Sequence, residues 1–208
     1  MTSSSIERRE GGTSSLLVAT TNAGKLREYR AMMADLSVKW QTLEDVGLAG
    51  MDVAETETTF IGNALLKAQA YAAASGLPTM ADDSGIVVDA LDGAPGVYSA
   101  RYAPTAAERN AKLLAALQGV PEEKRTARFV CIVAFATADG ITITAEGRVE
   151  GRVGFEERGT NGFGYDPVFV LDGGLTMAEI SSEAKNSLSH RGRALAKIRP
   201  LLVSWFTR

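Results

Sequence analysis

Apolar and polar positions along the chain repeat with two different spacings, which predicts strands interleaved with helices. Residues 16–20 form a short apolar run that ends in polar residues, and this favours a buried strand that opens into a loop. Residues 26–36 then carry apolar side chains at helical spacing. The alanine- and leucine-rich residues 60–75, followed by a Gly-Leu-Pro stop, predict a second helix.

The middle of the chain has the pattern of strands. Residues 78–81 and 86–91 are strand-like, and the polar residues 82–85 between them predict a turn. Residues 128–138 and 141–151 predict a hairpin. Apolar and polar side chains alternate in its second arm, so one face of this arm is expected to meet water.

Two more helices are predicted in the rest of the chain. Residues 105–118 begin with Thr105 as N-cap and carry Glu108 three positions later, the spacing of a capping box. Residues 195–205 place apolar side chains on one helical face, and Pro200 is expected to kink or interrupt that helix. Strands interleaved with helices, together with one hairpin, predict an α/β fold with a mixed sheet.

Composition narrows the class of protein. The chain has 208 residues, 45% of them hydrophobic and 23% charged, which suits one domain with its own core. No stretch reaches the ~20 apolar residues of a membrane-spanning helix, so no membrane partner is expected. The net charge of −3 disfavours a nucleic-acid polymer as partner, although a few focused cations still suit a small anion. Residues 1–15 are polar and rich in glycine and serine, which predicts a disordered tail before a single domain at residues 16–208.

Two residues that each occur once limit the chemistry. Cys131 is the only cysteine, so an internal disulfide and a cysteine metal cluster are excluded, and a reducing, cytoplasmic location fits. His190 is the only histidine. A Ser-His-Asp triad would have to use it, and a site with several histidine ligands is excluded.

The first candidate binding segment joins the first strand to the first helix. Thr20 and Thr21 lie in the loop, and Lys25 lies at the helix start. Backbone N–H groups at a helix start, two hydroxyls and an ammonium group together suit a phosphate. The alternative is an ordinary strand-to-helix loop with an exposed lysine.

The second candidate is acidic. Asp82 and Asp83 lie between apolar strands, where two adjacent carboxylates are costly unless they are solvated, hydrogen-bonded or bound to metal. Along an extended backbone they point to opposite sides, so one could bind Mg²⁺ or activate water while the other orients. A surface β-turn is the alternative. Glu55 and Glu57, before the helix at residues 60–75, could complete a carboxylate site or simply favour the helix start.

Two later segments complete the set. Residues 161–167 place Phe163 and Tyr165 among glycines, where an aromatic ring can stack on a base or simply pack inward. Residues 185–191 bring two cations and His190 together at a helix start, which suits phosphate oxygens and a purine edge; the alternative is a polar helix entry capped by Ser189. Together with the carboxylates, these segments describe a nucleotide phosphohydrolase that uses Mg²⁺.

Five motifs carry a resemblance to a known family. They are Ala-Thr-Thr-Asn-Ala-Gly-Lys (19–25), Ala-Asp-Asp-Ser-Gly (81–85), Gly-Ala-Pro-Gly-Val-Tyr-Ser-Ala-Arg-Tyr (93–102), Gly-Phe-Gly-Tyr-Asp-Pro (162–167) and Ser-His-Arg-Gly (189–192). In this order they resemble the HAM1-like inosine triphosphate pyrophosphatase family over nearly the whole chain after residue 15. The resemblance implies a long twisted mixed sheet, flanked by helices that form two lobes around a central cleft. It also implies a Mg²⁺-dependent homodimer that hydrolyses dITP, ITP and XTP to the monophosphate and pyrophosphate.

The resemblance also assigns roles to residues of this chain. Asp83 would be the general base and a metal ligand with Glu55, Asp82 would support it, and Lys25 would stabilise the leaving pyrophosphate together with Arg191. The triphosphate would be bound by Thr20, Thr21, Asn22, Ala23, Gly24 and Lys25, and Ser84 would touch substrate. The base would be enclosed by Phe163, Gly164, Tyr165 and Asp166, and the 6-oxo edge and phosphates would be read by Lys185, His190 and Arg191.

One position departs from the family pattern. The family usually has a glutamate immediately before the asparagine that corresponds to Asn63, whereas this chain has Gly62. Three other functions stay open at this point: a Maf-like pyrophosphatase of other modified bases, an aspartyl-phosphate phosphatase, and a non-catalytic nucleotide-binding module. The Ser-His-Arg-Gly motif argues against the first, and the missing Asp-x-Asp after the first strand argues against the second.

Overall fold

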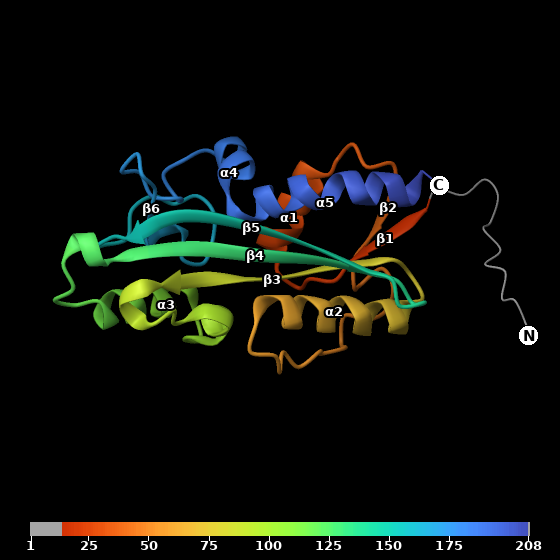
Figure 1. The fold of residues 1–208 in the computed structure, drawn as a ribbon, viewed down its shortest axis with the longest axis horizontal. Helices are drawn as coiled ribbons and strands as arrows, with labels where there is room; N and C mark the ends of the chain where they lie inside the picture. The colour runs from red at the N-terminus through yellow and green to blue at the C-terminus, as the bar shows by residue number, and fades with distance from the viewer. Residues whose placement is uncertain (1–13, 208) are drawn as a thin grey trace, which may run out of the picture.

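The computed structural model describes residues 14–207, and these form a six-stranded mixed sheet with helices on both faces (Figure 1). The strand order is β2-β1-β3-β4-β5-β6. The strands are β1 (Ser15–Val18), β2 (Lys39–Gln41), β3 (Thr79–Val88), β4 (Thr126–Ala136), β5 (Thr142–Val153) and β6 (Phe169–Val170). Most of the predicted tail lies outside the described residues, and Ser15, which was assigned to it, begins β1.

Strand directions make the sheet mixed, as predicted. β1 runs parallel to β2 and to β3, whereas the pairs β3–β4, β4–β5 and β5–β6 are antiparallel. The predicted hairpin is confirmed, because β4 and β5 pair from Ala136 opposite Thr142 to Thr126 opposite Arg152. The sequence pattern did not predict three short elements, which are β2 with 3 residues, β6 with 2 and the helix α4 with 7.

Five α-helices flank the sheet within the described residues. They are α1 (Ala23–Met32), α2 (Phe60–Ser75), α3 (Ala106–Ala116), α4 (Ser182–Leu188) and α5 (His190–Phe206). The capping box of α3 is present, and α2 has the predicted bounds, with Gly76 in the left-handed region at its end. α1 ends at Met32, so Leu36 lies beyond the helix, although its side chain is still buried.

Pro200 does not interrupt α5, which runs unbroken from His190 to Phe206. Proline removes one backbone donor, and the carbonyl four residues earlier then loses its partner. Both Pro200 and Ala196 are exposed, so water can satisfy that carbonyl. The predicted interruption is therefore wrong, because the exposed carbonyl can bond to water, and the alternative of a kink stays a prediction.

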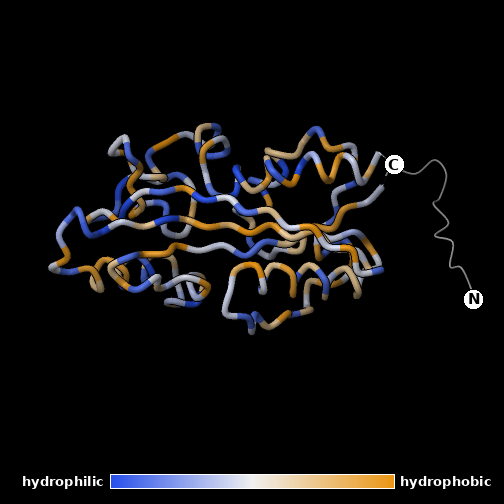
Figure 2. The backbone as a smooth tube through the Cα atoms, in the orientation of Figure 1, coloured by the Kyte–Doolittle hydropathy of each residue, from blue (hydrophilic) through white to orange (hydrophobic). Residues whose placement is uncertain are grey.

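Three apolar clusters divide the core into two lobes joined by the long strands. At one end, α1 and α5 pack on one face of the sheet, around Tyr29 and Leu195, and α2 packs on the other around Ala68. At the other end, Leu113 of α3 and Phe169 of β6 close a third cluster. β4 runs through both lobes and is mainly hydrophobic along its length (Figure 2).

The predicted turn at residues 82–85 is wrong. β3 continues through it, and Asp82 and Asp83 pair with Val133 and Ile132 of β4. Buried carboxylates are tolerated within a strand only when cations or donors compensate them. Both aspartates have such partners, and they point to opposite sides of the strand, as the extended backbone predicted.

Candidate active site

A pocket of about 760 Å³ lies between the two lobes and opens beside the middle of β3. That size suits a nucleotide-sized ligand. The predicted site residues that line it are Thr20, Thr21, Asn22, Lys25, Glu55, Asp82, Asp83, Ser84, Phe163, Gly164, Tyr165, Asp166, Lys185, His190 and Arg191. Ala23, Gly24 and Glu57 do not line it.

The start of α1 brings Lys25 to the pocket. Asn22 is the N-cap, and its side-chain oxygen accepts a hydrogen bond of 3.1 Å from the Lys25 backbone N–H. The Asn22 backbone N–H in turn donates to the Thr20 hydroxyl at 3.2 Å. Side chains of the loop itself thus order it. The Lys25 side chain extends from the first turn of α1 toward β3.

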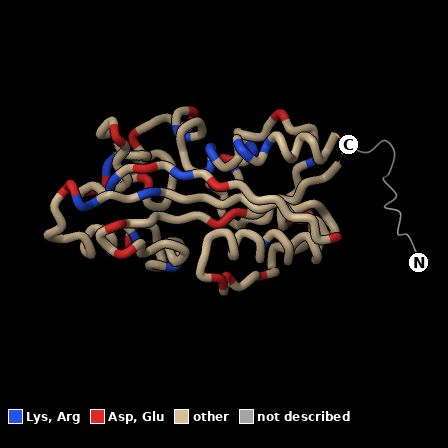
Figure 3. Tube along the Cα trace, in the orientation of Figure 1, with Lys and Arg blue, Asp and Glu red and all other residues tan. Residues whose placement is uncertain are grey.

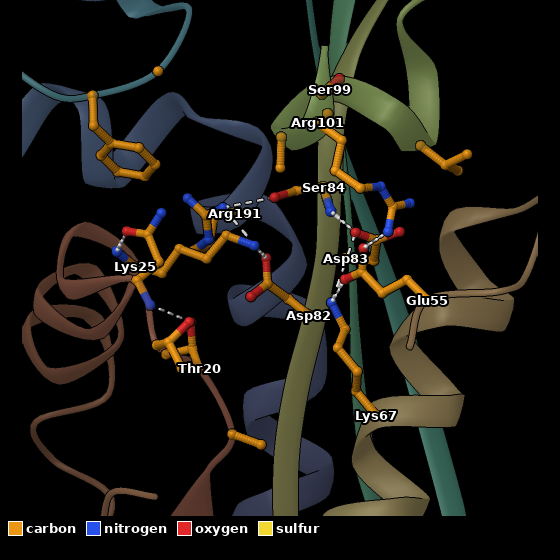
Figure 4. A pocket seen from close by; sticks show the side chains of 18 of the residues that line it. Thr20, Lys25, Glu55, Lys67, Asp82, Asp83, Ser84, Ser99, Arg101 and Arg191 are labelled. Atoms are coloured by element: carbon orange, nitrogen blue, oxygen red, sulfur yellow. Dashed lines mark hydrogen bonds and ion pairs between the residues drawn. The ribbon is translucent and has the colours of Figure 1, made fainter. Parts of the chain in front are cut away.

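Asp82 anchors two cations on this side of β3 (Figure 4). Its carboxylate lies 2.8 Å from Lys25 Nζ and 3.3 Å from the Arg191 guanidinium. Burial alone would raise the pKa of Asp82, but Lys25, Arg191 and Lys67 outweigh it and hold that pKa well below its usual range. Asp82 therefore stays ionised and does not exchange protons near neutral pH.

A second carboxylate, Glu28 of α1, extends this network. It accepts from Arg191 at 2.5 Å and from Lys185 at 2.9 Å. Lys185 also donates to Asp166 at 2.6 Å, and Asp166 accepts from the Phe163 backbone N–H at 2.7 Å. Arg191 further donates to the Ser84 hydroxyl at 2.9 Å. Buried acids and bases alternate here, so the cations are held in fixed positions before any ligand arrives.

The two aromatic residues of residues 161–167 have different roles. Tyr165 packs inward, and its hydroxyl donates to the Ser99 carbonyl at 2.8 Å. Phe163 stays at the pocket, with its ring 4.4 Å from Lys185 Nζ and packed against Gly24. The stacking role predicted for the segment can therefore belong to Phe163 alone.

His190 is buried at the start of α5, where Ser189 is the N-cap, as the sequence suggested. Its ring stacks on Phe129 with centroids 4.8 Å apart, and its Nδ1 finds no hydrogen-bond partner among residues 14–207. Burial, with the nearby Arg191 and Lys185 charges, places the pKa of His190 well below its usual value. His190 is therefore a neutral imidazole near neutral pH, and its Nδ1 is a buried polar atom without a partner in the described part of the chain.

Asp83 faces the opposite side of β3 and has different partners (Figure 4). Asn63 Nδ2 donates to its carboxylate at 3.2 Å, and Lys67 Nζ lies 3.8 Å away. Lys67 also contacts Glu55 at 2.5 Å, and Arg101 contacts the other oxygen of Glu55 at 3.2 Å. Burial and the Glu55 charge raise the pKa of Asp83 against the opposing effect of Lys67 and Asn63. Its carboxylate is therefore a better proton acceptor than a free aspartate.

Four residues of the site had no role in the sequence analysis: Glu28, Asn63, Lys67 and Arg101. Asn63 and Lys67 are four residues apart on α2, which is otherwise mainly apolar, and that spacing places both on one helical face. Glu28 follows Lys25 by three positions on α1, and this spacing likewise places both side chains on one helical face. Arg101 lies at the end of a short 3₁₀ segment and carried no periodic signal.

Comparison with known proteins gives the family. The sequence profile of the Ham1 family matches residues 16–201. The chain belongs to the Ham1 family. Among its relatives are dITP/XTP pyrophosphatases of Listeria monocytogenes, 49% identical over 91% of this chain and 95% of that protein, and of Xanthomonas oryzae, 52% identical over 88% and 94%.

Solved structures of Ham1 proteins have the same fold. The HAM1 protein from Coxiella burnetii aligns with a TM-score of 0.84 at 38% identity, over 92% of this chain and 99% of that one. A nucleoside-triphosphatase described as a dITP/XTP pyrophosphatase, from Mycobacterium abscessus, aligns with a TM-score of 0.73 at 44% identity, over 89% and 99%. The expected family and α/β architecture are therefore confirmed.

Two further observations concern charge and hydropathy in the described part of this Ham1 chain. Lys and Arg positions are interspersed with Asp and Glu positions along the trace rather than separated by sign (Figure 3). Within residues 14–207, no helix combines the length and the apolar character needed to cross a bilayer.

Proposed function

We propose that this protein hydrolyses the non-canonical purine nucleoside triphosphates dITP, ITP and XTP to the monophosphate and pyrophosphate. The observation that carries the proposal is the division of charge across β3. Lys25 and Arg191 are fixed by Asp82 on one side, and Asp83 and Glu55 face the pocket on the other. One pocket thus offers cations for phosphate beside a carboxylate that can accept a proton.

The carboxylates fit a magnesium ion. Lys67 Nζ contacts Glu55 at 2.5 Å and lies 3.8 Å from Asp83, so both carboxylates already face one shared cation. Among the described residues, no group of three acidic, histidine or cysteine side chains converges as a metal cage. Mg²⁺ does not need one, because it commonly uses one or two carboxylates together with water and substrate phosphates. Asp83 and Glu55 would hold the ion, which would neutralise phosphate charge when bound.

The residues of the chain supply the remaining chemistry. Asp83 orients a water molecule and accepts its proton, while the water oxygen bonds to the α-phosphorus. The bond from that phosphorus to the bridging oxygen breaks, and pyrophosphate leaves. Lys25 and Arg191 stabilise the charge that develops on the leaving group without moving, since Asp82 and Glu28 already hold them.

The base end of the pocket favours a 6-oxo purine. Lys185 can only donate hydrogen bonds, so it pairs with a carbonyl oxygen. The 6-amino group of ATP would place a donor against this donor. Phe163, beside Lys185, supplies a ring on which the base can stack.

A substrate panel tests this function. The protein is incubated with MgCl₂ and dITP, XTP, dGTP or p-nitrophenyl phosphate, and the inorganic product is identified. We expect pyrophosphate from dITP and XTP and little reaction with the other two. Orthophosphate release would instead favour a phosphatase, and the absence of pyrophosphate from both dITP and XTP would contradict the proposal.

Assembly and location belong to the same proposal. The resemblance to the Ham1 family supports a homodimer that works in the cytoplasm. Light scattering after size-exclusion chromatography tests the dimer, which would have about twice the 22.0 kDa mass of one chain.

A further inference from the structure

Gly62, the position that departs from the family pattern, lies under the segment that carries Glu55. Residues 54–59, here called the acidic segment, precede α2 without regular structure. A Cβ at position 62 would lie 2.7 Å from Glu57 Cβ, 2.8 Å from Glu57 Cγ and 3.0 Å from the Thr59 hydroxyl. Real Cβ atoms do not approach carbon atoms this closely. The acidic segment can therefore close over the first turn of α2 because residue 62 has no side chain.

Backbone groups hold the acidic segment in that place. The Gly62 N–H donates to the Thr59 hydroxyl at 3.1 Å, and the Glu57 N–H donates to Asn63 Oδ1 at 3.0 Å. Asn63 is fully buried, and its other side-chain atom, Nδ2, donates to Asp83 at 3.2 Å. One amide thus connects the backbone of the acidic segment to the carboxylate proposed as the base.

Glu55 lies two residues before Glu57 on this segment, so the same contacts set its distance from Asp83. The side-chain partners of Glu55 are Lys67 and Arg101, and both are cations that a bound metal ion would compete with. The hydrogen bonds from Glu57 N–H to Asn63 and from Gly62 N–H to Thr59 join neutral groups, and neither includes Glu55 or its cationic partners. We propose that Gly62 and Asn63 form a latch that positions Glu55 against Asp83, with both acting as positioning residues.

The consequence for magnesium rests on the proposed function, but the latch itself does not. Gly62→Ala adds the Cβ that meets Glu57, and Glu57→Gly removes the two carbon atoms nearest to that Cβ, leaving the Thr59 hydroxyl at 3.0 Å. Gly50→Ala is a matched control, because a Cβ at position 50 meets nothing within 4 Å. Amide hydrogen exchange of the metal-free proteins reports the latch directly. The MgCl₂ dependence of pyrophosphate release from dITP reports its effect on the site.

We expect Gly62→Ala to speed exchange of the Glu57 amide by ~10-fold or more and to raise the half-saturating MgCl₂ concentration by about tenfold. Turnover at saturating MgCl₂ should stay close to that of the unaltered protein. Glu57→Gly combined with Gly62→Ala should restore both quantities, and Gly50→Ala should change neither. Restoration by a second substitution separates positioning from a general loss of stability.

Two results would overturn the latch: unchanged exchange of the Glu57 amide in Gly62→Ala, or a defect that Glu57→Gly does not reverse. If the unaltered protein releases pyrophosphate without added metal, the magnesium assignment fails. The exchange measurements on the metal-free proteins then still decide the latch.

Discussion

The carboxylates of Asp82 and Asp83 are neighbours in sequence but belong to two separate networks. Asp82 lies 2.8 Å from Lys25 Nζ, whereas Asp83 accepts from Asn63 at 3.2 Å on the other side of β3. Burial opposes ionisation of both, but strong cation pairing lowers the pKa of Asp82 and the pKa of Asp83 is raised. One carboxylate thus anchors cations, and the other is the one proposed to accept a proton.

Asp83→Asn should separate activity from stability. We expect turnover of dITP to fall by ~100-fold or more, the scale of a lost general base. The raised pKa of Asp83 means that its charged form is disfavoured in the fold, so a neutral amide should not lower the free energy of unfolding at pH 7. Pyrophosphate release and thermal unfolding measure the two quantities. Turnover near that of the unaltered protein would remove Asp83 from the role of base.

Asp82→Asn, unlike Asp83→Asn, should lower the free energy of unfolding. It leaves Lys25 and the buried Arg191 without a shared anion, and loss of one partner of a buried ion pair typically costs about 3–5 kcal/mol. Urea unfolding of Asp82→Asn and Asp83→Asn side by side measures the difference. Equal stability of the two variants would contradict the division into two networks.

His190 should make stability depend on pH in a window where few other side chains titrate. Its pKa in the fold is well below 6.5, so below about pH 6.5 the unfolded chain binds a proton that the folded chain does not. Stability is therefore fully present above that pH and falls as pH decreases toward the folded pKa, by up to about 1.4 kcal/mol per pH unit. Urea unfolding between pH 7.5 and 5, compared with His190→Gln, measures the slope. A slope in His190→Gln as steep as in the unaltered protein would show that another group is responsible.

Phe163→Ala should weaken substrate binding more than catalysis. Loss of a stacking ring costs roughly 1–3 kcal/mol per base, which corresponds to a rise in KM for dITP of about 5- to 150-fold. The Phe163 ring contacts Lys185, which has no part in the proposed proton transfer, so kcat should change little. Steady-state kinetics with dITP separate the two constants, and Tyr165→Phe is a useful comparison because Tyr165 packs inward. A fall in kcat with unchanged KM would contradict the stacking role.

Local signals were sufficient for much of the fold. The bounds of α2 follow from a cap at Thr59 and a stop at Gly76, both next to the helix in sequence. The capping box of α3 has the same local origin. Elements of two to four residues, such as β2 and β6, have too few positions to show a period.

The continuous β3 could not be predicted locally, because what permits it is distant in sequence. Two carboxylates within a strand are unfavourable until Lys25 and Arg191 compensate Asp82, and Arg191 is 109 positions away. The side-chain donor to Asp83 is also outside its local sequence, since Asn63 is 20 positions away. Most residues that the sequence motifs named line the pocket, whereas Ala23 and Gly24 do not, and Glu28 and Lys67 became visible only as partners in the ion-pair network.

The central claim is that water attacks the α-phosphorus beside Asp83, and isotope labelling tests it most directly. The protein is incubated with dITP and MgCl₂ in H₂¹⁸O for a single turnover, and both products are examined by mass spectrometry. We predict one ¹⁸O atom in the nucleoside monophosphate and none in pyrophosphate. Label in pyrophosphate, or release of orthophosphate, would contradict the account.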